Sequence, residues 1–118
     1  MEQSLGGESF CYITTTGRVT GRPHEIEIWF GMNGSTIYML SGGGERSDWV
    51  RNLVKTPEVS VRIGGSEFSG AGRVVSDAAE DALARRLLLE KYSSTYDGDL
   101  TGWGRTALPV AIDLRITR

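Results

Sequence analysis

The sequence predicts an α+β domain, mainly antiparallel β, in which about six strands curl into a small barrel with two flanking helices. Three observations favour this class. Short glycine-containing turns join most of the strand-like runs, as in β-hairpins. The two helix-like runs do not alternate with strands in the repeated pattern that a parallel sheet needs. The 118 residues suit one domain, and no internal repeat divides them.

The first half of the chain supplies three of the strands. Residues 10–16 (FCYITTT) are aromatic and β-branched, which favours a strand. Residues 23–30 (PHEIEIWF) alternate between apolar and polar, which indicates a half-buried antiparallel strand. Asn33-Gly34 is a strong hairpin turn signal, and residues 36–40 (TIYML) form the next expected strand.

A short helix is expected over residues 47–57 (SDWVRNLVKTP). Ser47 is a candidate N-cap, and Asp48 suits the positive end of a helix. Pro57 ends the helix. Two further strands, residues 59–63 and 67–75, then form a hairpin around a Gly-Gly turn.

The last third predicts a second helix and a final strand. Residues 77–92 carry an apolar stripe, and Asp77 with Glu80 suits a capping box. Residues 107–116 form the final strand, in which Pro109 suggests a sheet edge or a bulge.

Two interpretations remain for residues 93–106 (SSTYDGDLTGWGRT), which carry no secondary-structure signal. Connections of this length are uncommon in compact domains, and the aromatic residues suit a lid over a ligand. The alternative is a loop that Trp103 pins to the core.

Composition narrows the function classes. The only cysteine, Cys11, cannot form an internal disulfide and is expected in the core, and a single histidine, His24, disfavours a metal site. The net charge of −2 disfavours nucleic acid as a partner. Residues 1–9 are acidic and lack the apolar segment of a signal peptide, so we expect a flexible lead, no stable membrane anchor and a cytoplasmic protein.

Several catalytic motifs are absent. No glycine fingerprint of a dinucleotide fold, no phosphate-binding loop with its lysine and no serine nucleophile elbow occurs. Little side-chain chemistry is left, so an enzyme of this sequence would depend on a bound cofactor for the difficult step.

The turn TTTGRVTGRP, residues 14–23, has two Gly-Arg pairs where a hairpin needs only glycine. Gly17 and Gly21 permit backbone conformations that aim N–H groups at an anion, and Arg18 and Arg22 add two-pronged donors. These features suit a phosphate. The alternative is a surface hairpin whose arginines are only solvated.

The chain also resembles the deazaflavin-dependent nitroreductase family, whose members are split β-barrel oxidoreductases that use coenzyme F420. The resemblance is carried by TTTGRVTGRP, SGGG, DWVRNL with TPEVSVRI, KYSSTYDG and GRTALPVAIDL, which occur in the order of the family's motifs. It covers residues 11–114, and it implies one split-barrel cofactor-binding domain over residues 1–118.

The resemblance implies the cofactor-binding residues. Those in the first loop, near the anionic part of the cofactor, are Thr16, Gly17, Arg18, Gly21, Arg22 and Pro23. Those at the end of the strand that follows, where the main chain would approach the cofactor, are Ser41, Gly42, Gly43 and Gly44. On the first helix they are Trp49 and Asn52; the alternative is that Trp49 is core and Asn52 incidental.

Two departures from the family pattern remove cations. Val19 and Gly42 stand where many members have lysine. We expect either altered cofactor binding or compensation by Arg46 and Arg51, which lie nearby in the sequence.

The function implied is hydride transfer from reduced F420 to an electron-poor acceptor such as a quinone, an enone or a nitroaromatic. Tyr92 or Tyr96, or water, would donate the proton, whereas His24 is better explained by a hydrogen bond to the main chain. Two alternatives stay open: a split-barrel reductase that binds FMN, and a non-catalytic carrier of deazaflavin or lipid. The partners expected are the small-molecule cofactor and acceptor, and a second copy in a homodimer.

Overall fold

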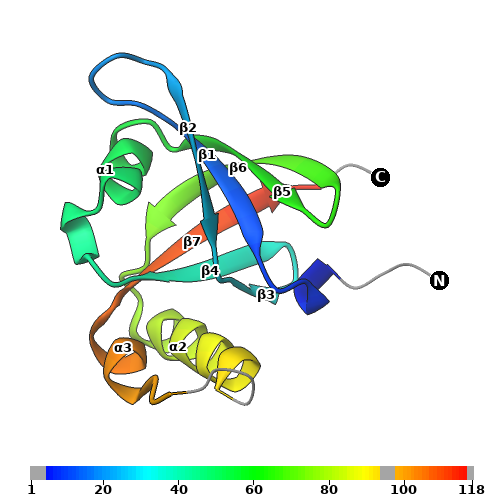
Figure 1. Ribbon diagram of the computed structural model, residues 1–118, viewed down its shortest axis with the longest axis vertical. Helices are drawn as coiled ribbons and strands as arrows, with labels where there is room; N and C mark the ends of the chain where they lie inside the picture. Colours follow the sequence, from blue (N-terminus) through cyan, green and yellow to red (C-terminus); the bar gives the residue numbers. More distant parts are fainter. Residues whose placement is uncertain (1–4, 94–97, 117–118) are drawn as a thin grey trace.

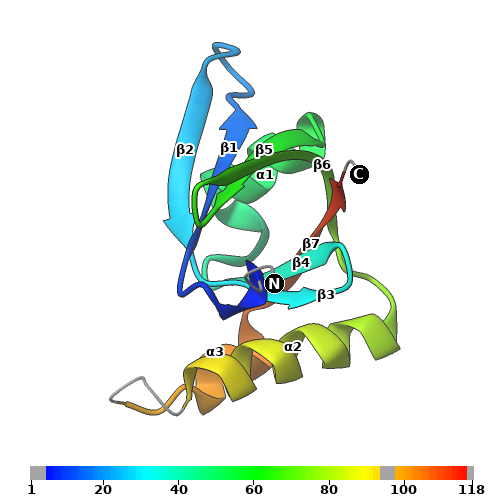
Figure 2. The same ribbon diagram turned by 90° about the vertical axis from the view of Figure 1, so that its right-hand side faces the viewer.

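The computed structural model describes residues 5–93 and 98–116. Within these ranges, seven strands form one sheet in the order β2-β1-β5-β6-β7-β4-β3, and every neighbouring pair is antiparallel. The strands are β1 (Cys11–Thr16), β2 (Pro23–Ile28), β3 (Gly31–Asn33), β4 (Thr36–Ser41), β5 (Glu58–Ile63), β6 (Ser66–Val74) and β7 (Leu108–Arg115). Figures 1 and 2 show the sheet curled on itself as a split barrel, which confirms the predicted fold class.

The helices lie at two places on the barrel. α1 (Asp48–Lys55) lies beside the turn that joins β1 to β2, and α2 (Ala78–Tyr92) packs with α3 (Thr101–Thr106) across one end (Figures 1 and 2). Short 3₁₀ turns, η1 (Leu5–Gly7) and η2 (Gly44–Arg46), precede β1 and α1. No helix in the described part of the chain is long and apolar enough to cross a membrane.

Two apolar clusters form the core because each strand alternates its side chains between two faces. The larger cluster fills the barrel; its fully buried members include Ile13, Phe30, Leu53 and Ile112. Cys11 belongs to this cluster, as expected, and burial raises the pKa of its thiol to about 12. The smaller cluster lies between the outer face of the sheet and α2.

The elements missed by the sequence prediction are the short ones. β3 has three residues, too few to show a period, and residues 101–106 form α3 although TGWGRT contains two glycines. Trp103 packs against the smaller cluster, which favours the interpretation of this segment as pinned to the core rather than as a lid over a ligand. Residues 1–9 were expected to be a flexible lead. Of these, Leu5 packs against the larger cluster, and residues 1–4 lie outside the described residues.

Two local expectations were met only in part. Pro109 does not mark an edge, because β7 lies between β6 and β4. The β6 ladder with β7 begins at Val110, so the proline nitrogen interrupts no bond on that side. Ser47 occupies the N-cap position of α1, as expected, but its side chain makes no cap bond, because its hydroxyl pairs with that of Ser41 at 2.9 Å. The Asp77 cap is confirmed by the 2.9 Å bond that its carboxylate accepts from the main-chain N–H of Glu80.

Candidate functional site

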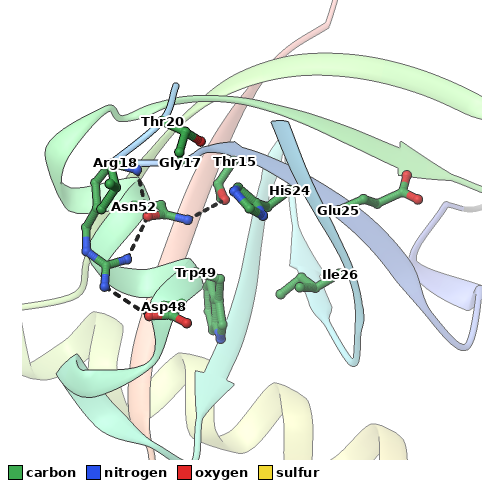
Figure 3. Close-up of a pocket in the computed structure, with 11 residues that line it drawn as sticks. Thr15, Gly17, Arg18, Thr20, His24, Glu25, Ile26, Asp48, Trp49 and Asn52 are labelled. Carbon is green, nitrogen blue, oxygen red and sulfur yellow. Dashed lines mark hydrogen bonds and ion pairs between the residues drawn. The ribbon is translucent and has the colours of Figure 1, made fainter. Parts of the chain in front are cut away.

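A pocket of about 500 Å³ opens between the β1–β2 turn and α1 (Figure 3). We call it the loop pocket. It is lined by Thr15, Gly17, Arg18, Val19, Thr20, His24, Glu25, Ile26, Asp48, Trp49 and Asn52. The lining therefore comes from the turn with its two flanking strands and from the start of α1, which are more than twenty residues apart in the chain.

Arg18 crosses from the turn to α1. Its guanidinium donates to Asn52 Oδ1 at 2.8 Å and to Asp48 Oδ1 at 3.0 Å, and its main-chain N–H donates to Asn52 Oδ1 at 3.1 Å. An arginine has five side-chain N–H donors, so donors remain for an anion. The side chain of Asp48 is 83% exposed, and ion pairs with an exposed partner are weak enough for a bound anion to replace them.

Asn52 holds this arrangement together. It is 4% exposed, and its Nδ2 donates to the hydroxyl of buried Thr15 at 3.3 Å while its Oδ1 accepts both bonds from Arg18. Asn52 lies one helical turn from Trp49, so the same face of α1 presents both. A buried amide with partners on both its atoms is a rigid link between β1, the turn and α1.

The turn itself is closed by main-chain bonds. The N–H of Gly17 donates to the carbonyl of Arg22 at 2.8 Å, and the N–H of Gly21 donates to the carbonyl of Gly17 at 2.9 Å. Gly21 has a φ of +77°, which other residues rarely adopt. At Gly17 a Cβ would lie 2.7 Å from Nε2 of His24, so glycine leaves room for that ring at the rim of the pocket.

Apolar side chains from α1 and β2 also line the loop pocket. Figure 3 shows the indole of Trp49 on one side of the pocket, with His24 and Ile26 of β2 on the other. Trp49 and Ile26 are partly buried and pack against the larger core cluster. A flat ring between them would bury apolar surface without unfolding any element.

A second hollow, of about 510 Å³, continues along β2 toward α3. We call it the aromatic pocket. It is lined by Phe10, Glu27, Ile28, Trp29, Leu40, Asp99, Leu100 and Trp103. Ile26 lines the loop pocket and Ile28 the aromatic pocket, and residues two apart on a strand share one face. The two pockets therefore adjoin each other along that face.

The structure brings together only part of the expected site. The predicted residues that line the loop pocket are Gly17, Arg18, Trp49 and Asn52. Three others border a separate hollow between the turn and β5; they are Thr16, Gly21 and Pro23. Arg22 is exposed and lines none of these hollows.

The strand end also lies outside the loop pocket. Its residues, Ser41, Gly42, Gly43 and Gly44, are absent from the lining. The Ser41 hydroxyl donates to the carbonyl of Gly44 at 3.0 Å, so this segment shapes the approach to α1. This segment can therefore affect the loop pocket only through the position of α1.

The loop pocket also contains residues that the sequence did not single out. Thr15, Ile26 and Asp48 line it. His24, which was expected to bond to the main chain, also lines the loop pocket, and its ring makes no main-chain bond among the described residues. The alternation of β2 could have indicated Ile26, because it shares a face with His24. Nothing in the sequence shows that Asp48 pairs with Arg18.

Tyr92 is not at either pocket wall, contrary to its expected role as proton donor. It is 5% exposed, stacks on Trp29 with ring centroids 4.2 Å apart, and its hydroxyl lies 2.8 Å from the carbonyl of Ser9. The same hydroxyl accepts the N–H of Phe30 at 3.0 Å. Burial raises its pKa to about 12, which makes it a poor acid. Tyr96, the other candidate, lies outside the described residues.

Comparisons with known proteins bear on this geometry. A family model described as F420H(2)-dependent quinone reductase matches residues 2–115. No curated protein matches the chain.

Among solved structures, a conserved hypothetical protein from Mycobacterium tuberculosis superposes with a TM-score of 0.74 at 18% identity, over 95% of this chain and 76% of that one. An F420-H2 dependent reductase, FDR-A, gives 0.69 at 18% identity, over 88% and 93%. A structure described as a domain-swapped dimer gives 0.71 at 18% identity, over 88% and 79%. At these identities the likeness shows the fold.

Proposed function

The chain belongs to the F420H2-dependent quinone reductase family, and from this premise we propose that the loop pocket is where it binds coenzyme F420. The family match makes the protein an F420-dependent oxidoreductase. The position of the cofactor is our inference. The observation that carries it is that Gly17, Arg18, Trp49 and Asn52, expected from separate motifs, line one pocket.

The residues present fit such a cofactor. Arg18 supplies unused N–H donors for an anionic group, and the glycines of the turn leave its main chain open to close approach. Trp49 and Ile26 provide apolar walls for a flat ring. When bound, reduced F420 supplies the hydride for the acceptor. The protein's part is to hold the ring in near-contact with the acceptor and to exclude water.

We assign the aromatic pocket to the acceptor. Trp29 and Trp103 meet edge to face there, with centroids 5.7 Å apart, and Phe10 adds a third aromatic side chain. Electron-rich faces suit an electron-poor flat molecule such as a quinone or a nitroaromatic. The Tyr92 hydroxyl is engaged with the main chain, which leaves water or Tyr96, a residue outside the described ranges, to supply the proton.

Two measurements test the function and the site. Reduced F420 mixed with menadione should be oxidised faster with the protein than without it. Fluorescence titration of F420 should show binding weakened about tenfold or more in Arg18→Ala and in Trp49→Ala. Thermal melting of both variants should show them folded. Wild-type affinity in both folded variants would remove these residues from the site.

A homodimer is the assembly we propose. β2 is an edge strand and all six of its residues are at least partly exposed. An unpaired edge of this kind suits pairing with a second copy. Light scattering during gel filtration should give twice the mass of the chain; the mass of a single chain across micromolar concentrations would contradict the dimer.

A further inference from the structure

The charged side chains that line the aromatic pocket all have the same sign. Among the described residues they are Glu27 and Asp99, and no arginine, lysine or histidine lines this hollow. The loop pocket differs, because the carboxylates there are accompanied by Arg18. The aromatic pocket is therefore an anionic environment, a property that holding a flat neutral acceptor does not require.

Asp99 carries its charge at the surface of the pocket. It is exposed, and its Oδ1 accepts the main-chain N–H of Thr101 at 2.9 Å. Hydrogen bonds from the side chain and the main chain of Thr101 lower the pKa of Asp99 from its ordinary 3.8, so the carboxylate is ionised at neutral pH. Asp99 forms no ion pair among the described residues, and Arg105 of α3, although exposed, does not line the pocket. Its charge is therefore available to a molecule bound beside it.

Glu27 of β2 is also exposed and keeps its charge. Its Oε1 accepts the hydroxyl of Tyr12 at 2.9 Å, a bond that orients the carboxylate without neutralising it. Arg62 lies over the ring of Tyr12, 4.2 Å from its centroid, but its guanidinium pairs with Glu25 at 3.0 Å. Within the described residues Glu27 thus has no cationic partner.

The aromatic side chains of the pocket add to the same electrostatic effect. Trp29 is held by Tyr92, on which it stacks at 4.2 Å, and it meets Trp103 at an angle of 86°. Phe10 is 42% exposed beside them. The face of an aromatic ring is its negative side and attracts cations. The rings and the two carboxylates therefore favour positive charge and oppose negative charge in this pocket.

We propose that the aromatic pocket selects acceptors by charge, favouring a cationic flat acceptor over an anionic one, with Glu27 and Asp99 as the selecting residues. This inference rests on the proposed function of the pocket. The carboxylates act on a charged substituent of the acceptor and take no part in the redox step. In that step a quinone gains a hydride from reduced F420 and one further proton and becomes the hydroquinone, while F420 is oxidised.

The experiment compares three acceptors with the same ring. They are menadione, which is neutral, and two derivatives whose methyl group carries a trimethylammonium or a sulfonate group. The value of kcat/KM for each acceptor is measured with saturating reduced F420. The quantity compared is the ratio of kcat/KM for the cationic acceptor to kcat/KM for the anionic one. Dividing the ratio of a variant by that of wild type cancels the intrinsic reactivity of the acceptors.

The variants are Glu27→Gln, Asp99→Asn and the double variant. Glutamine and asparagine keep an oxygen that accepts the bonds from Tyr12 and Thr101, so only the charge is removed. Glu67→Gln is the matched control, because Glu67 is an exposed carboxylate of β6 that lines none of the three hollows described above and forms no ion pair among the described residues.

We expect each single variant to lower the ratio about two- to fivefold and the double variant about four- to twentyfold, in line with exposed charge pairs. In the double variant kcat/KM should fall for the cationic acceptor and rise for the anionic one, with menadione between them. Glu67→Gln should keep the ratio of wild type. Raising the salt concentration should bring the wild-type ratio closer to that of the double variant.

A binding measurement without cofactor tests the same order. The chain has three tryptophans, and Trp49→Phe leaves only Trp29 and Trp103, which both line the aromatic pocket. Quenching of their fluorescence by each charged naphthoquinone gives its Kd. We expect the cation to bind more tightly than the anion, and adding Glu27→Gln and Asp99→Asn to reduce the difference.

Two results would overturn the proposal and leave the proposed function standing, provided that wild type reduces menadione. One is an unchanged ratio in the double variant, shown by thermal melting to be folded. The other is a change of all three kcat/KM values by one factor, which would mean that the carboxylates shape the pocket without selecting by charge. Wild type that reduces none of the three would refute the proposed function. The fluorescence titration would then decide alone, and equal Kd values for cation and anion would refute the charge selection as well.

Discussion

At the scale of single residues, Asn52 decides the shape of the loop pocket. Its amide joins Arg18 to Thr15, and no other described side chain bridges the turn and β1 in this way. The sequence motif indicates that Asn52 belongs to the site. The motif does not show that both polar atoms of the amide bond to protein groups, because those bonds exist only after α1 has packed against β1.

Replacing Asn52 by leucine should therefore loosen the turn. The side chain keeps its size, but Arg18 loses an acceptor for two donors, and we expect a loss of about 1–3 kcal/mol in the free energy of unfolding. F420 affinity should fall as well, because Arg18 is no longer held at the pocket. Urea unfolding and fluorescence titration measure the two effects. Reduced stability with wild-type affinity would mean that Asn52 does not position Arg18 for the cofactor.

For Tyr92 we predict a loss of stability without a loss of activity. Tyr92→Phe removes the hydroxyl that accepts the buried Phe30 N–H, so we expect the free energy of unfolding to fall by about 1–3 kcal/mol. The rate of menadione reduction by saturating reduced F420 should stay within about twofold of wild type. A large fall in that rate in the folded variant would restore Tyr92 as the proton donor.

At the scale of elements, the sequence predicted those with a strong local signal. The alternation of β2, and the Asp77 cap with the leucines of α2, identified both elements within two residues at each end. β3 and α3 were missed because their conformation depends on neighbours. Gly104 in α3 shows this, since a Cβ there would lie 2.7 Å from Leu89 of α2. Residue types alone do not encode that contact.

The packing of α1 on β6 depends on a second glycine. A Cβ on Gly72 would clash with the side chain of Leu53, which is fully buried. Gly72→Ala should therefore push α1 outward and lower the free energy of unfolding by about 1–3 kcal/mol.

F420 binding should weaken in the same variant, because Trp49 and Asn52 move with α1. Gly102→Ala is the control: a Cβ there meets nothing within 4 Å, so affinity should stay at the wild-type value, and stability should not fall, because alanine is favoured over glycine in a helix by up to about 1 kcal/mol. Equal behaviour of the two variants would show that the contact at Gly72 is not tight.

At the scale of the whole molecule, one charged network ties the barrel to the helical layer. Arg73 of β6 donates to Glu80 of α2 at 2.7 Å and to Asp113 of β7 at 2.8 Å, and Tyr38 of β4 donates to Glu80 at 2.6 Å. The sequence predicted Glu80 as half of a capping box. Its carboxylate instead serves this network, since the strands that carry Arg73 and Tyr38 meet only in the folded barrel.

The network predicts a pH dependence. The hydrogen bond from Arg73, and then that from Tyr38, lower the pKa of Glu80 from its ordinary 4.5 to about 2. A carboxylate whose pKa is depressed by folding stabilises the protein above its unfolded pKa, and this stabilisation is lost as the pH falls from about 4.5 toward 2. Urea unfolding at pH 6 and at pH 2.5 should show a larger acid loss in wild type than in Glu80→Gln.

Glu90→Gln is the control for that comparison, because Glu90 is exposed on the same helix and forms no ion pair among the described residues. It should lose stability with acid as wild type does. The same acid loss in Glu80→Gln as in wild type would mean that Glu80 does not carry the network.

The most direct measurement of the central claim is a crystal structure of the protein with F420 bound. We predict the ring between Trp49 and β2, with an anionic group of the cofactor on the guanidinium of Arg18. A structure with the loop pocket empty and the ring bound elsewhere would contradict the account.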